Sequence, residues 1–297
     1  MTRIKMSDHL SFSRIVLGFW RMDEWNLTTD QLIHFLEECL DLGITTMDHA
    51  DIYGNYTFEE LFGNALEKKP ELRKRMELVT KCTIVYPTAT VRVKFYDSSK
   101  KWIISQVEKS LRNMRTDYLD SLLLHRPDPF MNPEEVASAF DTLLKDGKVR
   151  TFGVSNYLPH EFRMLKSYLT VPLVTNQVEL SCLRMENLEN GVISMCLEER
   201  IHPMIWSPLA GGKIFTGQDE TTERLRNTLE QIRAELGAES IDTIAFAWLL
   251  SHPVGAIPIT GSGEMQYVKR PVESLQYTLT AEQWFMIWTA VKGHKVL

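Results

Sequence analysis

Four side chains that can hold or transfer protons fall within six residues of the segment TTMDHADIYGN, residues 45–55. Asp48 ends an apolar run, and Tyr53 follows in a turn with Gly54 that lets its phenol bend back over Asp48. A carboxylate and a phenol at the end of a buried run are the groups that general acid–base chemistry uses.

Lys81 and His125 hold comparable positions further along the chain, since each follows a run of apolar residues. A buried lysine is costly unless it is paired, and Asp48 on a neighbouring strand offers the carboxylate. A phenol beside a buried ammonium has its phenolate form favoured, so we expect the pKa of Tyr53 to fall from about 10 toward neutral pH. The chemistry this predicts is proton transfer by Tyr53, tuned by Lys81 and Asp48.

Simpler explanations compete at the remaining polar positions. His125 alone would suit a core as well as a site, but a Lys–Asp pair on neighbouring strands favours a chemical role. We expect Asp51 to cap or brace its loop and His49 to line the pocket. A metal hydrolase built on Asp48, His49 and His125 ranks far lower, because the sequence holds no HxH or HExxH pattern, and we expect no bound metal.

These groups end short β-branched or aliphatic runs that alternate with longer segments of helical periodicity. Eight such strands predict a (β/α)8 TIM barrel of the α/β class, because a doubly wound sheet usually stops at about six or seven. The strand candidates are 14–19, 44–48, 76–81, 119–125, 149–155, 172–177, 203–207 and 256–260. The helix candidates between them are 28–43, 57–69, 98–114, 133–147, 158–169, 184–200 and 221–237.

Additional segments complete the expected barrel. The first dozen residues are expected to form an N-terminal hairpin that closes the barrel bottom, and 240–253 and 280–293 to form extra C-terminal helices. In the second of these, Trp284, Phe285 and Trp288 have the helical spacing of a face that docks the helix. No linker rich in Ser or Gly interrupts the chain, so we expect residues 1–297 to form a single domain.

Composition excludes several classes of function. The 33 basic and 39 acidic residues give a net charge of −6 with no basic arm, so we expect no nucleic-acid partner. No apolar run is long enough to cross a bilayer, so we expect no membrane association. Four widely spaced cysteines, with no secretory leader before them, favour reduced thiols and a cytoplasmic location.

In a barrel of this kind the carboxyl ends of the strands build the active site. Exposure to water explains a polar residue at any single strand end, but the joint convergence of so many polar groups favours a site. The residues at the ends of the second to the eighth strands are Asp48, Lys81, His125, Ser155, Asn156, Gln177, Trp206, Ser207, Thr260, Gly261 and Ser262.

Seven motifs resemble those of the aldo-keto reductase family and appear in the family's order over nearly the whole chain. They are MDHADIYG, LVTKC, LLLHRPDP, GKVRTFGVSN, TNQVELS, WSPLAGG and IPITGSG. Within the family the chain is most similar to bacterial oxidoreductases of the YdhF type, which share WSPL and GSG. The resemblance implies a (β/α)8 barrel that binds a nicotinamide cofactor in extended form without a GxGxxG turn.

The resemblance also implies a reaction and roles. The reaction is hydride transfer from NAD(P)H to the carbonyl carbon of an aldehyde or ketone, which gives an alcohol. Tyr53 is the implied general acid, tuned by Lys81 and Asp48, and His125 orients the carbonyl oxygen. The implied substrate is a small-molecule carbonyl compound.

Most cofactor contacts follow from the same resemblance. The nicotinamide carboxamide is implied to lie against Ser155, Asn156 and Gln177, and its ring against Trp206, where the family usually has tyrosine. Small residues near the pyrophosphate permit close approach, and Lys213 balances its charge. The complete implied set is Gly18, Trp20, Ser155, Asn156, Gln177, Trp206, Ser207, Leu209, Gly211, Gly212, Lys213, Gly261, Ser262 and Tyr267.

The cofactor's adenosine end departs from the family pattern. The family commonly clamps the 2′-phosphate of NADPH with a basic residue after the eighth strand, but Tyr267 stands there and Glu264 adds a repelling carboxylate. Lys269 and Arg270 are the basic residues that could substitute. The usual glycine–threonine contact of the first loop is altered to GFW at 18–20. We expect NADPH as the cofactor, with NADH as the alternative.

Aromatic residues on the loops suggest the substrate. Phe19, Trp20, Trp25 and Tyr86 are expected to wall a pocket with His125 for an apolar or aromatic carbonyl compound rather than a free sugar. For Trp25, packing between loops explains its presence equally well. Arg126 is expected to brace its loop.

A second function remains open, a nucleotide-binding regulatory or redox-sensing subunit of the same fold. The complete set of Asp48, Tyr53, Lys81 and His125 favours catalysis. No added coiled coil or basic arm indicates a protein partner, so we expect a monomer or small homo-oligomer.

Overall fold

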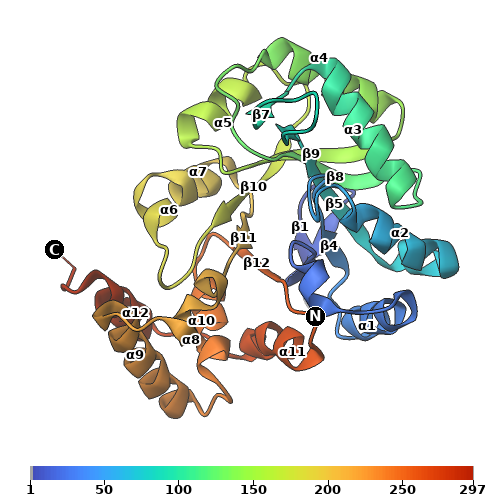
Figure 1. The fold of residues 1–297 in the computed structure, drawn as a ribbon. Coiled ribbons are helices and arrows are strands. Elements are labelled where there is room, and N and C mark those ends of the chain that lie inside the picture. Colours follow the sequence, from blue (N-terminus) through green and yellow to red (C-terminus); the bar gives the residue numbers. More distant parts are fainter. Residues whose placement is uncertain (1–2, 297) are drawn as a thin grey trace.

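A computed structural model describes residues 3–296 of the chain. Eight parallel strands close into a barrel, visible at the centre of Figure 1, with helices around its outside. The strands are β3 (Val16–Gly18), β4 (Thr46–Asp48), β5 (Glu77–Cys82), β8 (Leu119–Leu124), β9 (Val149–Ser155), β10 (Leu173–Glu179), β11 (Met204–Trp206) and β12 (Ile257–Thr260). The predicted TIM barrel and all eight strand candidates are confirmed.

Helices follow the strands as the helical periodicity predicts. They are α1 (Thr29–Asp41), α2 (Phe58–Lys68), α3 (Lys100–Asn113), α4 (Pro133–Lys145), α5 (Pro159–Lys166), α6 (Glu186–Glu189), α7 (Val192–Glu199) and α9 (Glu220–Leu236). The single helix predicted over 184–200 is wrong, because the chain breaks between α6 and α7. Gly191 lies at this break with a φ of 88°, a left-handed conformation that does not continue a helix.

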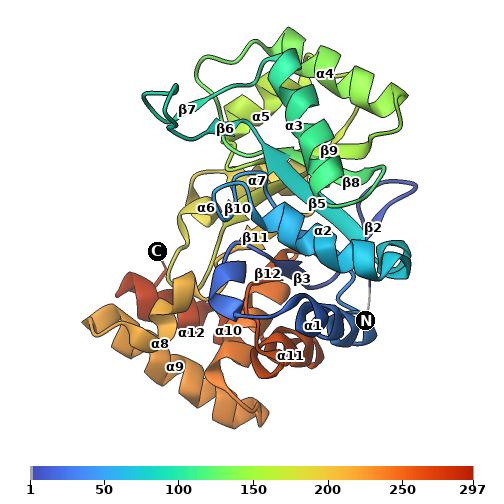
Figure 2. The same ribbon diagram turned by 45° about the vertical axis from the view of Figure 1, so that its right-hand side comes forward.

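Further helices from the C-terminal part of the chain pack beside the barrel. Both α10 (Ile241–Leu250) and α12 (Ala281–Lys292) are confirmed, and Figures 1 and 2 place α12 next to α9 at one edge of the molecule. The ring of Trp284 stacks on that of Trp248 with their centroids 4.9 Å apart, and Trp288 also packs on the core. The predicted docking face is therefore confirmed at Trp284 and Trp288 and wrong at Phe285, which is exposed.

The structure contains two α-helices that the sequence did not predict, α8 (Lys213–Thr216) and α11 (Met265–Glu273). The signals of α11 in the sequence are weak, because Pro271 lies inside the helix and Glu264 provides no side-chain cap. None of the helices in the described range is long and apolar enough to cross a membrane.

Two hairpins flank the barrel. The predicted N-terminal hairpin is confirmed by the antiparallel pairing of β1 (Arg3–Lys5) with β2 (Ser11–Ser13), while residues 1 and 2 lie outside the described range. Phe12 of this hairpin is fully buried in one cluster with Val16 and Val79, so the hairpin closes the barrel interior. A second hairpin, β6 (Ile84–Val85) with β7 (Phe95–Tyr96), extends the loop after β5.

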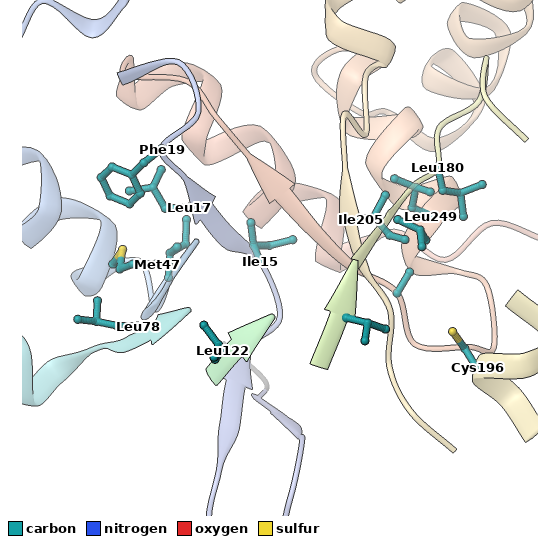
Figure 3. Packing of buried hydrophobic residues seen from close by; sticks show 14 of the residues in the cluster. Ile15, Leu17, Phe19, Met47, Leu78, Leu122, Leu180, Cys196, Ile205 and Leu249 are labelled. Carbon is teal, nitrogen blue, oxygen red and sulfur yellow. The ribbon is translucent and has the colours of Figure 1, made fainter. Parts of the chain in front are cut away.

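Alternating side chains of the strands divide the apolar core into two parts. Figure 3 shows Leu17, Met47 and Leu78, which belong to the large cluster between strands and helices. The neighbouring residues Val16 and Val79 belong instead to the small inner cluster. Because successive residues of a strand point to opposite faces, every second residue continues this inner column toward the carboxyl end of its strand.

Candidate active site

The inner column of side chains ends in polar residues at the carboxyl ends of the strands. Lys81 lies two residues after Val79 and is fully buried, and His125 lies two residues after Leu123. Asp48 ends β4 and is 3% exposed. The period of two in each strand therefore brings these three side chains to one end of the barrel interior.

Lys81 is the centre of a compact group of contacts. Its ammonium Nζ donates to both oxygens of Asp48 at 2.9 and 2.8 Å and to the carbonyl oxygen of His49 at 2.7 Å. It also lies 3.2 Å from the hydroxyl of Tyr53. With an ammonium donating to its oxygen, the phenol is left with its own O–H to give to a substrate.

The pKa values in this group differ from the sequence expectation at Tyr53. Burial, together with the charge of Asp48, raises the pKa of the Tyr53 phenol above 10.0, although Lys81 opposes this. Our prediction of a lowered pKa is wrong, because it counted the ammonium and not the desolvation of the phenolate. Burial alone would lower the pKa of Lys81, but Asp48 and Tyr53 outweigh it and the pKa is raised.

His125 lies beside the phenol as a neutral imidazole. Its ring meets that of Tyr53 edge-on with centroids 6.0 Å apart. Burial and the positive charges of Lys81, Arg126 and Lys94 lower its pKa well below 6.5. A neutral imidazole has one N–H to donate, which suits it to hold a carbonyl oxygen without adding a charge.

Polar contacts link the catalytic group to the next strands. Gln177 Nε2 donates to Asp48 Oδ1 at 2.8 Å, and Ser155 Oγ donates to the carbonyl oxygen of Gln177 at 2.9 Å. Asn156 Nδ2 donates to Ser155 Oγ at 2.7 Å, and the indole N–H of Trp206 donates to Asn156 Oδ1 at 3.0 Å. The residues implied to hold a nicotinamide are therefore fixed by contacts with Asp48 and with one another.

A cleft of about 1190 Å³ opens over these residues. It runs from the catalytic group along the loop after β11 to the start of α11, an extended path like that expected for a dinucleotide. The predicted site residues that line it are Gly18, Trp20, Trp25, Asp48, Tyr53, Tyr86, His125, Ser155, Asn156, Gln177, Trp206, Ser207, Leu209, Gly211, Gly212, Gly261, Ser262 and Tyr267.

Several predicted residues lie elsewhere. Lys81 lies behind Asp48 and Tyr53, fully buried and not in the cleft wall. Lys213 is exposed in α8 and does not line the cleft. Phe19 was expected in the substrate pocket but is fully buried, since it packs on Trp25 with ring centroids 5.2 Å apart.

The two other polar residues of the first motif also lie outside the cleft. His49 was expected to line the pocket, but its neutral ring is buried and stacks on Phe19 with centroids 4.0 Å apart. The position after Asp48 points to the opposite face of the strand, which explains the error. The buried carboxylate of Asp51 has no hydrogen-bond partner in the described part of the chain, so the expectation that it braces its loop is not supported. Only its backbone N–H holds the loop, by donating to the carbonyl oxygen of Lys81 at 3.0 Å.

The loop after β11 has an unusual backbone. Ser207, Ala210, Gly211 and Gly212 all have positive φ, with 91° at Gly212. A glycine is required there for conformational reasons, and its lack of a side chain leaves backbone groups open to the cleft. Arg21 lies beside this loop, since a Cβ built on Gly211 would be 3.6 Å from a guanidinium nitrogen of Arg21.

Sequence reasoning missed three cations that line the cleft, Arg21, Lys94 and Arg126. Arg21 and Arg126 could have been found, because each directly follows a residue of the predicted site. Lys94 had no such signal, since its long loop matches no motif. The expectation that Arg126 braces its loop is not supported, because its side chain forms no hydrogen bond or ion pair with residues 3–296 and faces the cleft instead.

At the far end of the cleft, α11 supplies one basic residue. Arg270 lines the cleft with Tyr267 and Glu264, whereas Lys269 is exposed and does not. Arg270 forms ion pairs with Glu239 at 3.4 Å and with Asp242 at 3.9 Å, and its buried Nη1 forms no hydrogen bond in the described part of the chain. A guanidinium nitrogen that forms no hydrogen bond can still donate one to an anionic ligand.

Known proteins are similar to this chain in sequence. The model of the Aldo/keto reductase family matches residues 14–291. The oxidoreductase YcsN of Bacillus subtilis is 51% identical to this chain over 100% of both chains. The oxidoreductase YdhF of Escherichia coli is 46% identical over 96% of this chain and 95% of its own. A 6-dehydroglucose reductase of Agrobacterium fabrum is 42% identical over 100% of both chains.

Solved structures agree on the architecture. A glycerol dehydrogenase from Gluconobacter oxydans superposes with a TM-score of 0.85 at 23% identity, covering 98% of this chain and 95% of its own. An aldo/keto reductase from Klebsiella pneumoniae in complex with NADP and acetate does so with a TM-score of 0.77 at 23% identity, covering 96% and 93%. The similarity to the YdhF type is confirmed, and the chain belongs to the aldo/keto reductase family.

Proposed function

We propose that the chain is an NADPH-dependent reductase that converts an aldehyde or ketone to an alcohol. The observation that carries this proposal is the Tyr53 hydroxyl at 3.2 Å from the buried Lys81 ammonium, in a cleft that His125 also lines. A bound nicotinamide would supply the hydride. The face of Trp206, the side chains of Ser155, Asn156 and Gln177, and the glycine-rich loop 207–212 are suited to hold it.

The chain's own residues supply the proton and its control. His125 donates a hydrogen bond that positions the carbonyl oxygen beside Tyr53. As negative charge develops on that oxygen, the Tyr53 hydroxyl transfers its proton. The positive charge of Lys81 stabilises the phenolate that remains, and Asp48 holds the ammonium in place through two hydrogen bonds.

The direct test is the absorbance of reduced nicotinamide, followed with purified protein and a panel of aldehydes. Turnover of one or more aldehydes supports the proposal. Tight cofactor binding without turnover of any carbonyl compound contradicts it and favours the regulatory or redox-sensing subunit instead.

For the cofactor we propose NADPH, with Arg270 as the residue that binds the 2′-phosphate. The place of Arg270 in the cleft wall, with an Nη1 that forms no hydrogen bond within residues 3–296, supports this, and so does the complex of the Klebsiella pneumoniae aldo/keto reductase with NADP. Arg21 beside Gly211 is the proposed counter-charge for the pyrophosphate, in place of Lys213.

The prediction for this site concerns Arg270→Gln. We expect the KM for NADPH to rise about tenfold or more, because a charge-assisted contact is lost, while the KM for NADH changes little. Side-by-side titration with both cofactors measures this, and Lys269→Gln is the matched control because Lys269 lies outside the cleft. Equal effects on both cofactors would place the phosphate elsewhere.

A sugar aldehyde is a second candidate substrate, against our expectation of an apolar or aromatic compound. The relative from Agrobacterium fabrum is named a 6-dehydroglucose reductase.

We also propose that the chain acts as a single domain in the cytoplasm, as a monomer or small homo-oligomer. Strands from both ends of the chain in one barrel support the single domain, and four buried free cysteines agree with a reducing location.

A further inference from the structure

Two cations border the catalytic end of the cleft. Lys94 comes from the hairpin loop between β6 and β7, and Arg126 directly follows His125. Both line the cleft together with Tyr53 and His125. Arg126 is partly buried and Lys94 is exposed, so one lies deeper than the other at the mouth of the site.

Neither cation forms an ion pair or a side-chain hydrogen bond within residues 3–296, although Glu179 at the end of β10 lies within range of Arg126. Burial raises the pKa of Glu179, and the charges of Arg184 and Arg126 oppose this rise. Asp48, the carboxylate nearest the reaction centre, is already bound by Lys81 and Gln177. The two side chains therefore present their donors to whatever enters the cleft.

Aromatic rings hold the two cations close to the walls. Lys94 Nζ lies 5.2 Å from the ring centroid of Tyr86, and Arg126 Cζ lies 5.8 Å from that of Trp206. Cation–π contacts at these distances orient the side chains without using their N–H donors. The donors that stay free suit a molecule that carries several oxygen atoms.

The donor chemistry limits the kind of substrate. An ammonium carries three donors and a guanidinium five, and neither has an acceptor. A hydrocarbon tail would displace water from these groups without accepting a hydrogen bond from them, which is energetically unfavourable. A carboxylate or several hydroxyl groups would satisfy them.

We propose that Lys94 and Arg126 select short carbonyl substrates whose end opposite the carbonyl is rich in oxygen, either acidic or hydroxylated. This inference rests on the proposed reductase function and specifies its substrate class. It replaces the apolar pocket that the loop aromatics alone suggested. Lys94 and Arg126 are positioning residues in this assignment, since the proton and the carbonyl oxygen belong to Tyr53 and His125.

Two size-matched pairs of aldehydes test the proposal. Succinic semialdehyde against butanal measures the preference for an acid group, and glyceraldehyde against propanal the preference for hydroxyl groups. We expect the wild type to favour the oxygen-rich member of at least one pair by about tenfold or more in kcat/KM. Lys94→Gln and Arg126→Gln should reduce that ratio, mainly through KM.

Arg92→Gln is the matched control, because Arg92 carries the same charge in the same loop, is exposed and does not line the cleft. This variant should keep the wild-type ratio. A preference for the acidic member alone should weaken as salt is added, since charge attraction is screened, whereas a preference for hydroxyl groups should change less. Absence of any preference, or a preference that survives both substitutions, would overturn the proposal.

Binding measured without turnover separates this inference from the function on which it rests. Trp20 and Trp206 line the cleft, so their fluorescence can report the binding of each aldehyde to the protein loaded with NADP. Tighter binding of the oxygen-rich member, lost in Arg126→Gln, supports the selection even where no aldehyde is reduced. Equal binding of both members rejects it even where all are reduced.

Discussion

At the scale of single residues, the site depends on a balance between burial and charge. Burial of Tyr53 and its nearness to Asp48 favour the neutral phenol, while Lys81 favours the phenolate. The result is a phenol that stays protonated at neutral pH with a cation next to it. Such a group can give up its proton when an acceptor appears, because the ammonium stabilises the charge that forms.

Tyr53→Phe tests this role directly. We expect kcat for aldehyde reduction to fall by about 10²-fold or more, because the general acid that protonates the carbonyl oxygen is removed. The Kd for NADPH, measured by fluorescence titration, should change less than about threefold. Lys81→Met should lower kcat nearly as much, because the positive charge beside the phenol is lost. Ordinary turnover by Tyr53→Phe would exclude the phenol as the acid.

The pH dependence follows from the directions of the pKa shifts. The pKa of Tyr53 is raised above 10.0, so the acid form persists as pH rises through the ordinary range. The pKa of His125 is lowered well below 6.5, so the imidazole stays neutral as pH falls through that value. We expect kcat for reduction at saturating substrates to stay level from about pH 6 to about pH 9. A fall of kcat near pH 8 would indicate a lowered Tyr53 pKa instead.

At the scale of elements, the barrel strands and their loops position these residues through close contacts of the backbone. Helix α2 follows the loop that carries Tyr53 and packs against the end of α3 at Gly63. A Cβ built on Gly63 would lie 1.8 Å from the carbonyl oxygen of Asn113. This contact fixes how near α2 approaches α3, and with it the start of the Tyr53 loop.

Gly63→Ala should therefore force the two helices apart. We expect the free energy of unfolding to fall by about 1–3 kcal/mol, the usual effect of overpacking against a backbone atom that cannot move away. Denaturant unfolding measures the change. Glu60→Ala, on the exposed side of α2, is the control and should change the stability by less than about 0.5 kcal/mol. An unchanged stability in Gly63→Ala would show that the helices separate freely.

At the scale of the whole molecule, the barrel has one closed end and one open end. The N-terminal hairpin fills the closed end, where Phe12 and Leu10 complete the inner apolar cluster. The open end holds the cleft, with loops from across the chain around it. This polarity keeps the apolar interior apart from the polar groups that do the chemistry.

Phe12→Ala tests how much the closed end of the barrel contributes to stability. We expect the free energy of unfolding to fall by about 3–5 kcal/mol, because a fully buried aromatic ring is replaced by a cavity. Phe285→Ala is the control, since Phe285 is 45% exposed on α12 and should lose far less. Thermal or denaturant unfolding compares the two. Similar losses in both variants would show that Phe12 does not seal the barrel.

Local pattern alone was enough to predict the barrel and most of the site. Short β-branched or aliphatic runs and segments of helical period alternate along the chain, and these are properties of neighbouring residues. Asp48, Lys81 and His125 could be found because each ends such a run. Helix α11 was missed because its proline and uncapped start hide it from pattern reasoning.

The sequence by itself determined the strands, their order and the residues at their ends, because backbone geometry makes side-chain direction follow from position in a strand. Only the tertiary structure decided how strongly each group is desolvated, and this reversed the expected pKa shift of Tyr53. It alone also brought Lys94 and Arg126 to the same mouth. Desolvation and the meeting of distant loops depend on atoms remote in the chain, and no local pattern records them.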